Sequence, residues 1–107
     1  MSGIIFVNEK TTFSMRSAYF SELMEILNSH FTAKSIVIPG LNLEISELFK
    51  NLELSSLSRK DFAVFSQASR EMYRDVSNSK KYGESFIEEW QRLNSALTSD
   101  PRHGEQI

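Results

Sequence analysis

The stretch that decides the fold runs from Leu57 to Val76 and reads LSRKDFAVFSQASREMYRDV. Ser58 and Asp61 have the form of a capping box, in which the Ser58 hydroxyl accepts a hydrogen bond from the Asp61 backbone N–H. Leu57 and Phe62 stand at the two positions of a hydrophobic staple. Apolar or small side chains then recur at the spacing of one helical face: Phe62, Phe65, Ser69, Met72 and Val76. We therefore predict a helix that begins after Ser58 and lies at the centre of the core.

The flanking sequence predicts three further helices. The first runs from about Met15 to Phe31 and has an apolar face built on Leu23 and Leu27. The second runs from Leu43 to Leu52, capped by Asn42, with Glu44, Glu47 and Lys50 pointing outward. Its apolar face comprises Ile45, Leu48, Phe49 and Leu52. The last helix runs from about Glu84 to Leu97 and is stopped by Asp100-Pro101.

Two short β-branched runs suggest strands. Ile4–Val7 predicts a buried strand, and Thr11–Ser14 follows it as a turn and cap region. Ser35–Ile38 is a second run of this kind, closed by Pro39-Gly40. If both runs are strands, they form a βαβ-like unit or flank the helices separately. The alternative for the second run is an extended linker packed on the helices.

The fold class that follows is mostly α: a compact bundle of about four helices with up to two short N-terminal strands. The 107 residues are the size of one domain, 1–107, in which 102–107 form a frayed tail. The side chains predicted to form the core are Leu23, Leu48, Phe62, Phe65, Met72, Trp90 and Leu93.

Composition excludes several classes of protein. The formal net charge of −2 is not that of a general nucleic-acid binder. The N-terminus has no basic region ahead of its short apolar run, and no apolar run approaches the ~18 residues of a membrane span. The chain contains no cysteine, which fits a reducing compartment. We expect a soluble, cytoplasmic protein that contacts neither membrane nor nucleic acid directly.

The sequence assembles no catalytic set. Its two histidines, His30 and His103, fall at a helix end and in the tail, and without cysteine there is no thiolate nucleophile. The glycines are isolated, so no phosphate-binding loop is present. Carboxylate pairs such as Glu44 and Glu47 lie on the polar sides of helices, where a solvated face explains them. We expect no enzyme, no metal and no cofactor.

Negative charge is concentrated in residues 41–57, which contain three glutamates and one lysine, Lys50. An acidic helix and loop of this kind could meet a basic partner, and charge complementarity chiefly sets on-rate and specificity. Asp75 and Tyr82 could form rim contacts beyond the central helix, and an aromatic such as Tyr73 or Tyr82 could anchor the contact. The residues predicted to bind a partner are Glu44, Glu47, Glu53, Tyr73, Asp75 and Tyr82.

The chain resembles small bacterial immunity proteins, the antidotes to contact-dependent growth inhibition toxins. The likeness is one of size, acidity and helical layout, and it includes the helix start Leu57–Phe62 and the last helix with Phe86, Trp90 and Leu93 before Asp100-Pro101-Arg102. The resemblance implies a cytoplasmic, non-catalytic protein, monomeric or heterodimeric with its toxin. That toxin would be a basic nuclease domain whose active site the protein occludes. The net charge of −2 is weaker than that of strongly acidic nuclease antidotes, which leaves the activity of the toxin open.

The alternative is a small regulatory or adaptor protein that binds an endogenous partner or self-associates. An exposed apolar stripe on the last helix, formed by Ile87, Trp90 and Leu97, would favour self-association. A deep pocket that converges on Glu or His side chains would instead favour a small enzyme.

Overall fold

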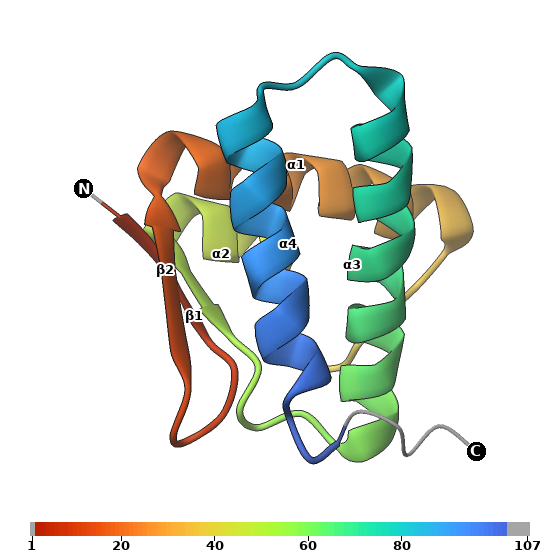
Figure 1. Ribbon diagram of the computed structural model, residues 1–107. Helices are drawn as coiled ribbons and strands as arrows, with labels where there is room; N and C mark the ends of the chain where they lie inside the picture. Colours follow the sequence, from red (N-terminus) through yellow and green to blue (C-terminus); the bar gives the residue numbers. More distant parts are fainter. Residues whose placement is uncertain (1, 103–107) are drawn as a thin grey trace.

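The computed structural model describes residues 2–102, which form four helices and one three-stranded sheet (Figure 1). In chain order the elements are β1 (Ser2–Phe6), β2 (Thr12–Arg16), α1 (Ser17–Lys34), α2 (Leu43–Phe49), β3 (Asn51–Glu53), α3 (Arg59–Ser79) and α4 (Glu84–Thr98). The predicted class, mostly α with short strands at the N-terminus, is confirmed.

Helix α3 begins as its cap predicts. The Ser58 hydroxyl accepts a hydrogen bond from the Asp61 N–H at 3.1 Å, which satisfies one of the free donors of the first turn. The helix continues to Ser79, past Val76, where the apolar stripe read from the sequence ends. Helix α4 begins at Glu84 as predicted and ends one residue after Leu97.

The sheet differs from the prediction. Strand β1 is central, with β2 antiparallel on one side and β3 parallel on the other. The predicted turn at 11–14 is wrong, because these residues enter β2, where Met15 is buried and Phe13 packs against the core. The predicted second helix is too long: it ends at Phe49, and Leu52 is fully buried in β3 rather than on a helical face.

Ser35–Ile38 forms no strand, so the linker interpretation holds. Ser35 adopts a left-handed conformation (φ 54°) that ends α1. The Ile36 N–H then bonds back to the Phe31 carbonyl at 2.8 Å, and residues 36–38 pair with no strand of the sheet. Ile38 is buried and Ile36 is partly buried against the core, so the segment packs through these two side chains, while Val37 is exposed.

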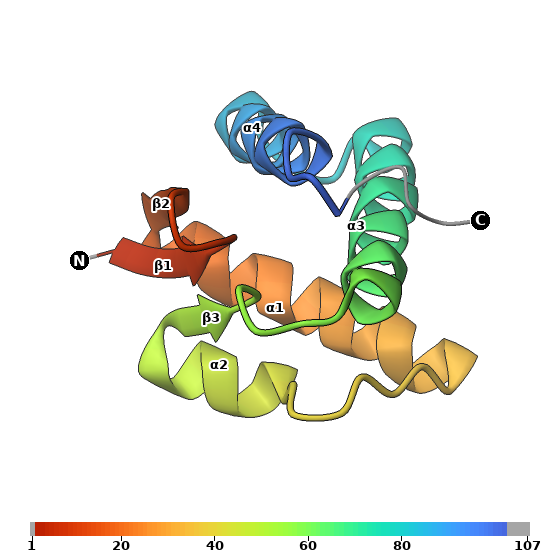
Figure 2. The same cartoon turned by 90° about the horizontal axis from the view of Figure 1, so that it is seen from below.

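The central element is α1 rather than α3. It contacts α2, α3, β1 and β2. Figure 2 shows α3 and α4 on one side of α1 and α2 on the other. The centre of the molecule is therefore a helix with weaker amphipathic patterning than α3, because it is covered on more than one side.

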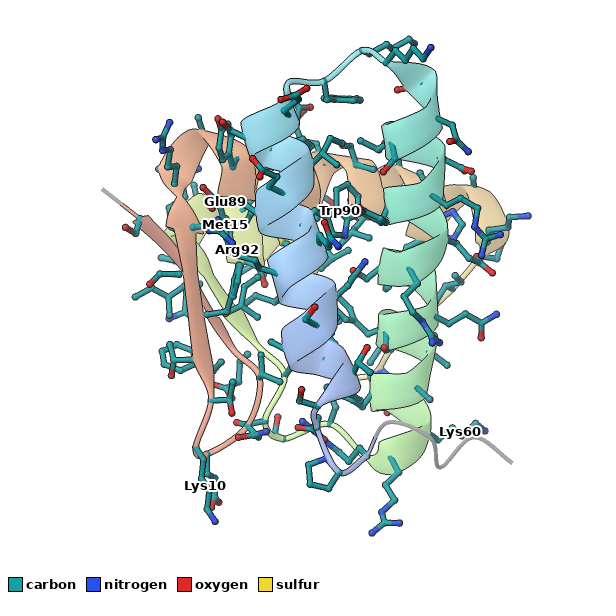
Figure 3. The ribbon with its side chains drawn as sticks, in the orientation of Figure 1. Lys10, Met15, Lys60, Glu89, Trp90 and Arg92 are labelled. Atoms are coloured by element: carbon teal, nitrogen blue, oxygen red, sulfur yellow. The ribbon has the colours of Figure 1, made fainter. Side chains whose placement is uncertain are left out.

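Most of the predicted core is confirmed. Leu23, Phe62, Phe65, Trp90 and Leu93 are fully buried. Trp90 points from α4 toward α3 (Figure 3), where its indole N–H donates to the Ser69 hydroxyl at 3.0 Å. Met72 packs only partly buried at the edge of the core. The prediction for Leu48 is wrong, since that side chain is 75% exposed.

Arg102 is firmly held, although the sequence placed it at the start of a frayed tail. Its guanidinium donates to the carbonyls of Val7, Leu54 and Leu57 at 2.6–2.9 Å and lies 4.0 Å from the centroid of the Phe62 ring. It also pairs through two nitrogens with the buried Asp100 carboxylate. Arg102 thereby ties the segment after α4 to Val7, which follows β1, and to the segment that enters α3. The rest of the predicted tail, 103–107, lies outside the described residues.

Candidate functional site

Helix α2 is short and is fixed at both ends. The Asn42 side chain accepts from the Ile45 N–H at 3.1 Å, and Lys50 adopts a left-handed conformation (φ 55°) that ends the helix. Its buried residues are Leu43 and Ser46, and the helix contacts α1 and β3. Leu43 and Ser46 therefore define the inner face of α2.

The outer face of α2 is apolar. Ile45, Leu48 and Phe49 are 52%, 75% and 70% exposed, and Val37 in the preceding linker is 83% exposed. These four are the exposed large hydrophobic residues of the described part of the chain. The sequence assigned this stripe to the core, but Leu43 and Ser46 occupy the inner face instead. Exposed apolar residues gathered on one element mark interaction sites.

Carboxylates flank this apolar stripe. Glu44 is exposed, and Leu48 follows it by four residues, so the two side chains are neighbours on the helix surface. Glu47 is half-buried on the same flank. Lys50 donates its ammonium to the Ser21 hydroxyl of α1. We define the α2 surface as Val37, Glu44, Ile45, Glu47, Leu48 and Phe49.

Two other predicted binding residues have local structural roles. Glu53 in β3 is exposed, and its carboxylate accepts from both the N–H (3.1 Å) and the hydroxyl of Ser55. Tyr73 packs its ring against the edge of Trp90, with centroids 6.3 Å apart. Neither residue is part of the α2 surface as defined above.

Asp75 and Tyr82 line a different surface, an open groove of about 600 Å³ between α1 and α3. Glu22 and Glu25 of α1 line the same groove. Because α1 separates α2 from α3 (Figure 2), the predicted binding residues fall on two surfaces rather than one. Only Glu44 and Glu47 belong to the α2 surface. Its apolar residues were missed as binding residues because an exposed stripe and a core stripe have the same spacing in sequence.

Two titratable groups outside the α2 surface, His30 and Asp100, have charged partners within residues 2–102. His30 is largely buried in α1, and its Nε2 lies 3.5 Å from a Glu71 carboxylate oxygen on α3. Asp100 is the one described carboxyl with a pKa clearly below its usual range, because it accepts hydrogen bonds from Arg102. No group of three or more His, Cys, Asp or Glu side chains within residues 2–102 could hold a metal ion. The α2 surface combines exposed apolar side chains with carboxylates, which are groups that can bind a partner protein.

Comparisons with protein-family models, with curated proteins and with solved structures find no match for this chain. Among residues 2–102, none of the helices combines the length and apolar composition that a membrane span requires.

Proposed function

We propose that this chain is an immunity protein, a non-catalytic antidote that binds a cognate bacterial toxin and occludes its active site. One observation carries the proposal: α2 presents Ile45, Leu48 and Phe49 to solvent beside the carboxylates of Glu44 and Glu47. Apolar anchors supply affinity when a partner buries them, and the adjacent charge selects the partner. The resemblance in size, acidity and helical layout supports a toxin as that partner.

The charge on this surface favours a basic partner. A nuclease fits, because its active site must hold phosphates and is lined by Lys or Arg. A second copy of the chain fits poorly. In a two-fold contact the same patch meets itself, which would bring the glutamates of both copies to one interface, while Lys50 is engaged with Ser21.

The candidate stripe for self-association on α4 is not available. Trp90 and Leu97 are fully buried, and Ile87 packs against the core. An adaptor that binds an endogenous protein could use the α2 surface in the same way as an antidote. Protection of cells against a toxin separates these two functions.

The test first examines the genomic neighbourhood for a large toxin gene immediately upstream, and then co-expresses this chain with the C-terminal domain of the toxin found there. The expected results are cell survival and a complex at micromolar concentration or tighter. Cell death at the rate seen without this chain, or failure of the purified proteins to associate, contradicts the proposed function.

Paired charge reversals locate the interface. Glu44→Lys with Glu47→Lys should abolish protection. The matched control is Glu22→Lys with Glu25→Lys, which has the same three-residue spacing on the exposed surface of α1. Loss of binding only in the control variant would move the interface to the groove between α1 and α3.

A further inference from the structure

A hollow of about 320 Å³ adjoins the α2 surface, between the end of α1, the linker 35–42 and the start of α2. Its walls include Ile36, Val37, Leu41 and Leu43, and Glu44 is the charged residue that lines it. Val37 and Glu44 thus belong to both the hollow and the α2 surface. We infer that this hollow, the Glu44 hollow, binds a lysine or arginine side chain of the protein partner. The inference rests on the proposed function and deepens it.

The walls suit the aliphatic part of such a side chain. Lysine and arginine carry three or four methylene groups that pack against apolar surface while the charged head stays near polar atoms. Leu41 and Ile36 are partly buried members of the apolar cluster, and Leu43 is buried. They offer the stem a wall anchored in the core rather than a mobile surface side chain.

Two features favour a positive head group. The Glu44 carboxylate is exposed and takes part in no ion pair within residues 2–102. The hollow also lies at the C-terminal end of α1, since Phe31, Thr32 and the C-cap residue Ser35 line it. That end of a helix carries partial negative charge, which favours a cation. Lys34, the basic residue of the last turn of α1, does not line the hollow.

The remaining polar walls can accept or donate hydrogen bonds. Asn28 and Thr32 line the hollow, and both present oxygens that a guanidinium or ammonium can use. The Asn42 side-chain oxygen is already taken by the Ile45 N–H. The hollow therefore joins an apolar wall, a carboxylate and a helix C-terminus. This set distinguishes a basic side chain from an apolar or an acidic one.

The inference can be tested without the toxin. Isotope-labelled protein is titrated with N-acetyl-arginine amide and followed by ¹H–¹⁵N NMR spectra, with N-acetyl-citrulline amide as the uncharged ligand of the same shape. We expect saturable shifts for arginine at the amides of Ser35, Val37, Leu41 and Glu44, and none for citrulline. Glu44→Gln should weaken binding about tenfold, the loss expected for one charge-assisted hydrogen bond. Glu47→Gln, the matched control on the same helix, should not.

Equal shifts with citrulline, shifts spread over carboxylates across the whole surface, or unchanged binding in Glu44→Gln would overturn the inference. The titration tests binding at the Glu44 hollow and the survival assay tests the proposed function, so either can give a negative result while the other is positive. If the chain does not protect cells but binds arginine at the Glu44 hollow, the partner is a basic protein other than a toxin. If it protects cells but does not bind arginine there, the hollow has been assigned wrongly.

Discussion

Replacing Gly3 with alanine should lower the free energy of unfolding of this protein. Gly3 is buried in β1, and a Cβ built on it would meet the Cβ, Cγ and Cδ2 atoms of Phe20 at less than 3.0 Å, a separation that real Cβ atoms essentially never show. Phe20 is fully buried at the start of α1, so its ring cannot swing into solvent. Helix and strand would have to move apart.

Such overpacking costs about 1–3 kcal/mol and occasionally more, against a gain of roughly 0.4–1 kcal/mol from the stiffer unfolded chain. We expect a net loss of about 1–2 kcal/mol, or a melting temperature lowered by about 4–10 °C. The matched control is Gly83→Ala, because nothing lies within 4 Å of a Cβ there. Gly83 is the N-cap of α4, so this change should cost no more than about 1 kcal/mol.

The assay is urea unfolding followed by Trp90 fluorescence and by circular dichroism. A double-mutant cycle adds a sharper criterion: Phe20→Leu should cost at least about 1 kcal/mol less in the Gly3→Ala background than in the wild type. If Gly3→Ala is as stable as the Gly83→Ala control, or if the two changes at Gly3 and Phe20 are additive, the steric reasoning is refuted.

Four further predictions concern buried or partly buried polar groups. Ser69→Ala should cost ~1–3 kcal/mol in urea unfolding, because its hydroxyl accepts from Trp90 and donates to Asn94 at 2.6 Å. Ser66→Ala should be neutral or stabilising, since the buried Ser66 hydroxyl has no hydrogen-bond partner within residues 2–102; a larger loss at Ser66 than at Ser69 would contradict this. Arg102→Lys should cost about 2 kcal/mol or more although charge is kept, because one ammonium cannot serve the carbonyls of Val7, Leu54 and Leu57 together; unfolding like that of the wild type would refute it. The hydrogen bonds from Arg102 hold the pKa of Asp100 below its usual range. The stability that Asp100 contributes is therefore present above about pH 4 and is lost as the pH falls toward the pKa of the folded state. Unfolding curves from pH 6 to pH 2 should show this loss in the wild type, and an equal loss in Asp100→Asn would count against it.

The parts of the fold that the sequence predicts are those set by local signals. Ser58 and Asp61 cap α3 as their spacing requires, and Trp90 and Leu93 of α4 are buried as expected. For both helices the capping or stop signal, the period of the apolar residues and the length of the segment all predict the same structure. A segment is predictable from sequence when such independent signals agree.

The missed elements depend on partners far away in the chain. Strand β3 has three residues, and its Leu52 aligns with Ile5 of β1. A segment this short is a strand only because another strand pairs with it, and sequence periodicity does not contain that information. The same limit explains residues 36–38, which resemble a strand in sequence, whereas in the structure Ile36 and Ile38 pack against the core and no partner strand is present.

At the candidate site the charge was predictable and the exposure was not. Glu44 and Glu47 stand out as an acidic pair, whereas Ile45, Leu48 and Phe49 have the spacing of a core stripe. Which face of α2 turns inward is decided by its neighbours: Leu43 and Ser46 are buried where α2 meets α1 and β3. An apolar stripe that stays exposed after folding has the same sequence pattern as one that packs in the core. The sequence alone therefore does not distinguish the two.

The rigidity of α2 bears on how its surface can bind. Association is weakened by the entropy of ordering side chains and loops at the interface. Here the Asn42 cap and the left-handed Lys50 fix both ends of the helix, and Leu43 anchors it in the core. The backbone that carries Leu48 and Phe49 is therefore fixed before a partner binds, which reduces the part of that cost due to ordering the backbone. An exposed apolar stripe on a loose segment would be an aggregation hazard, whereas on a capped and anchored helix beside carboxylates it has the properties of a preformed binding surface.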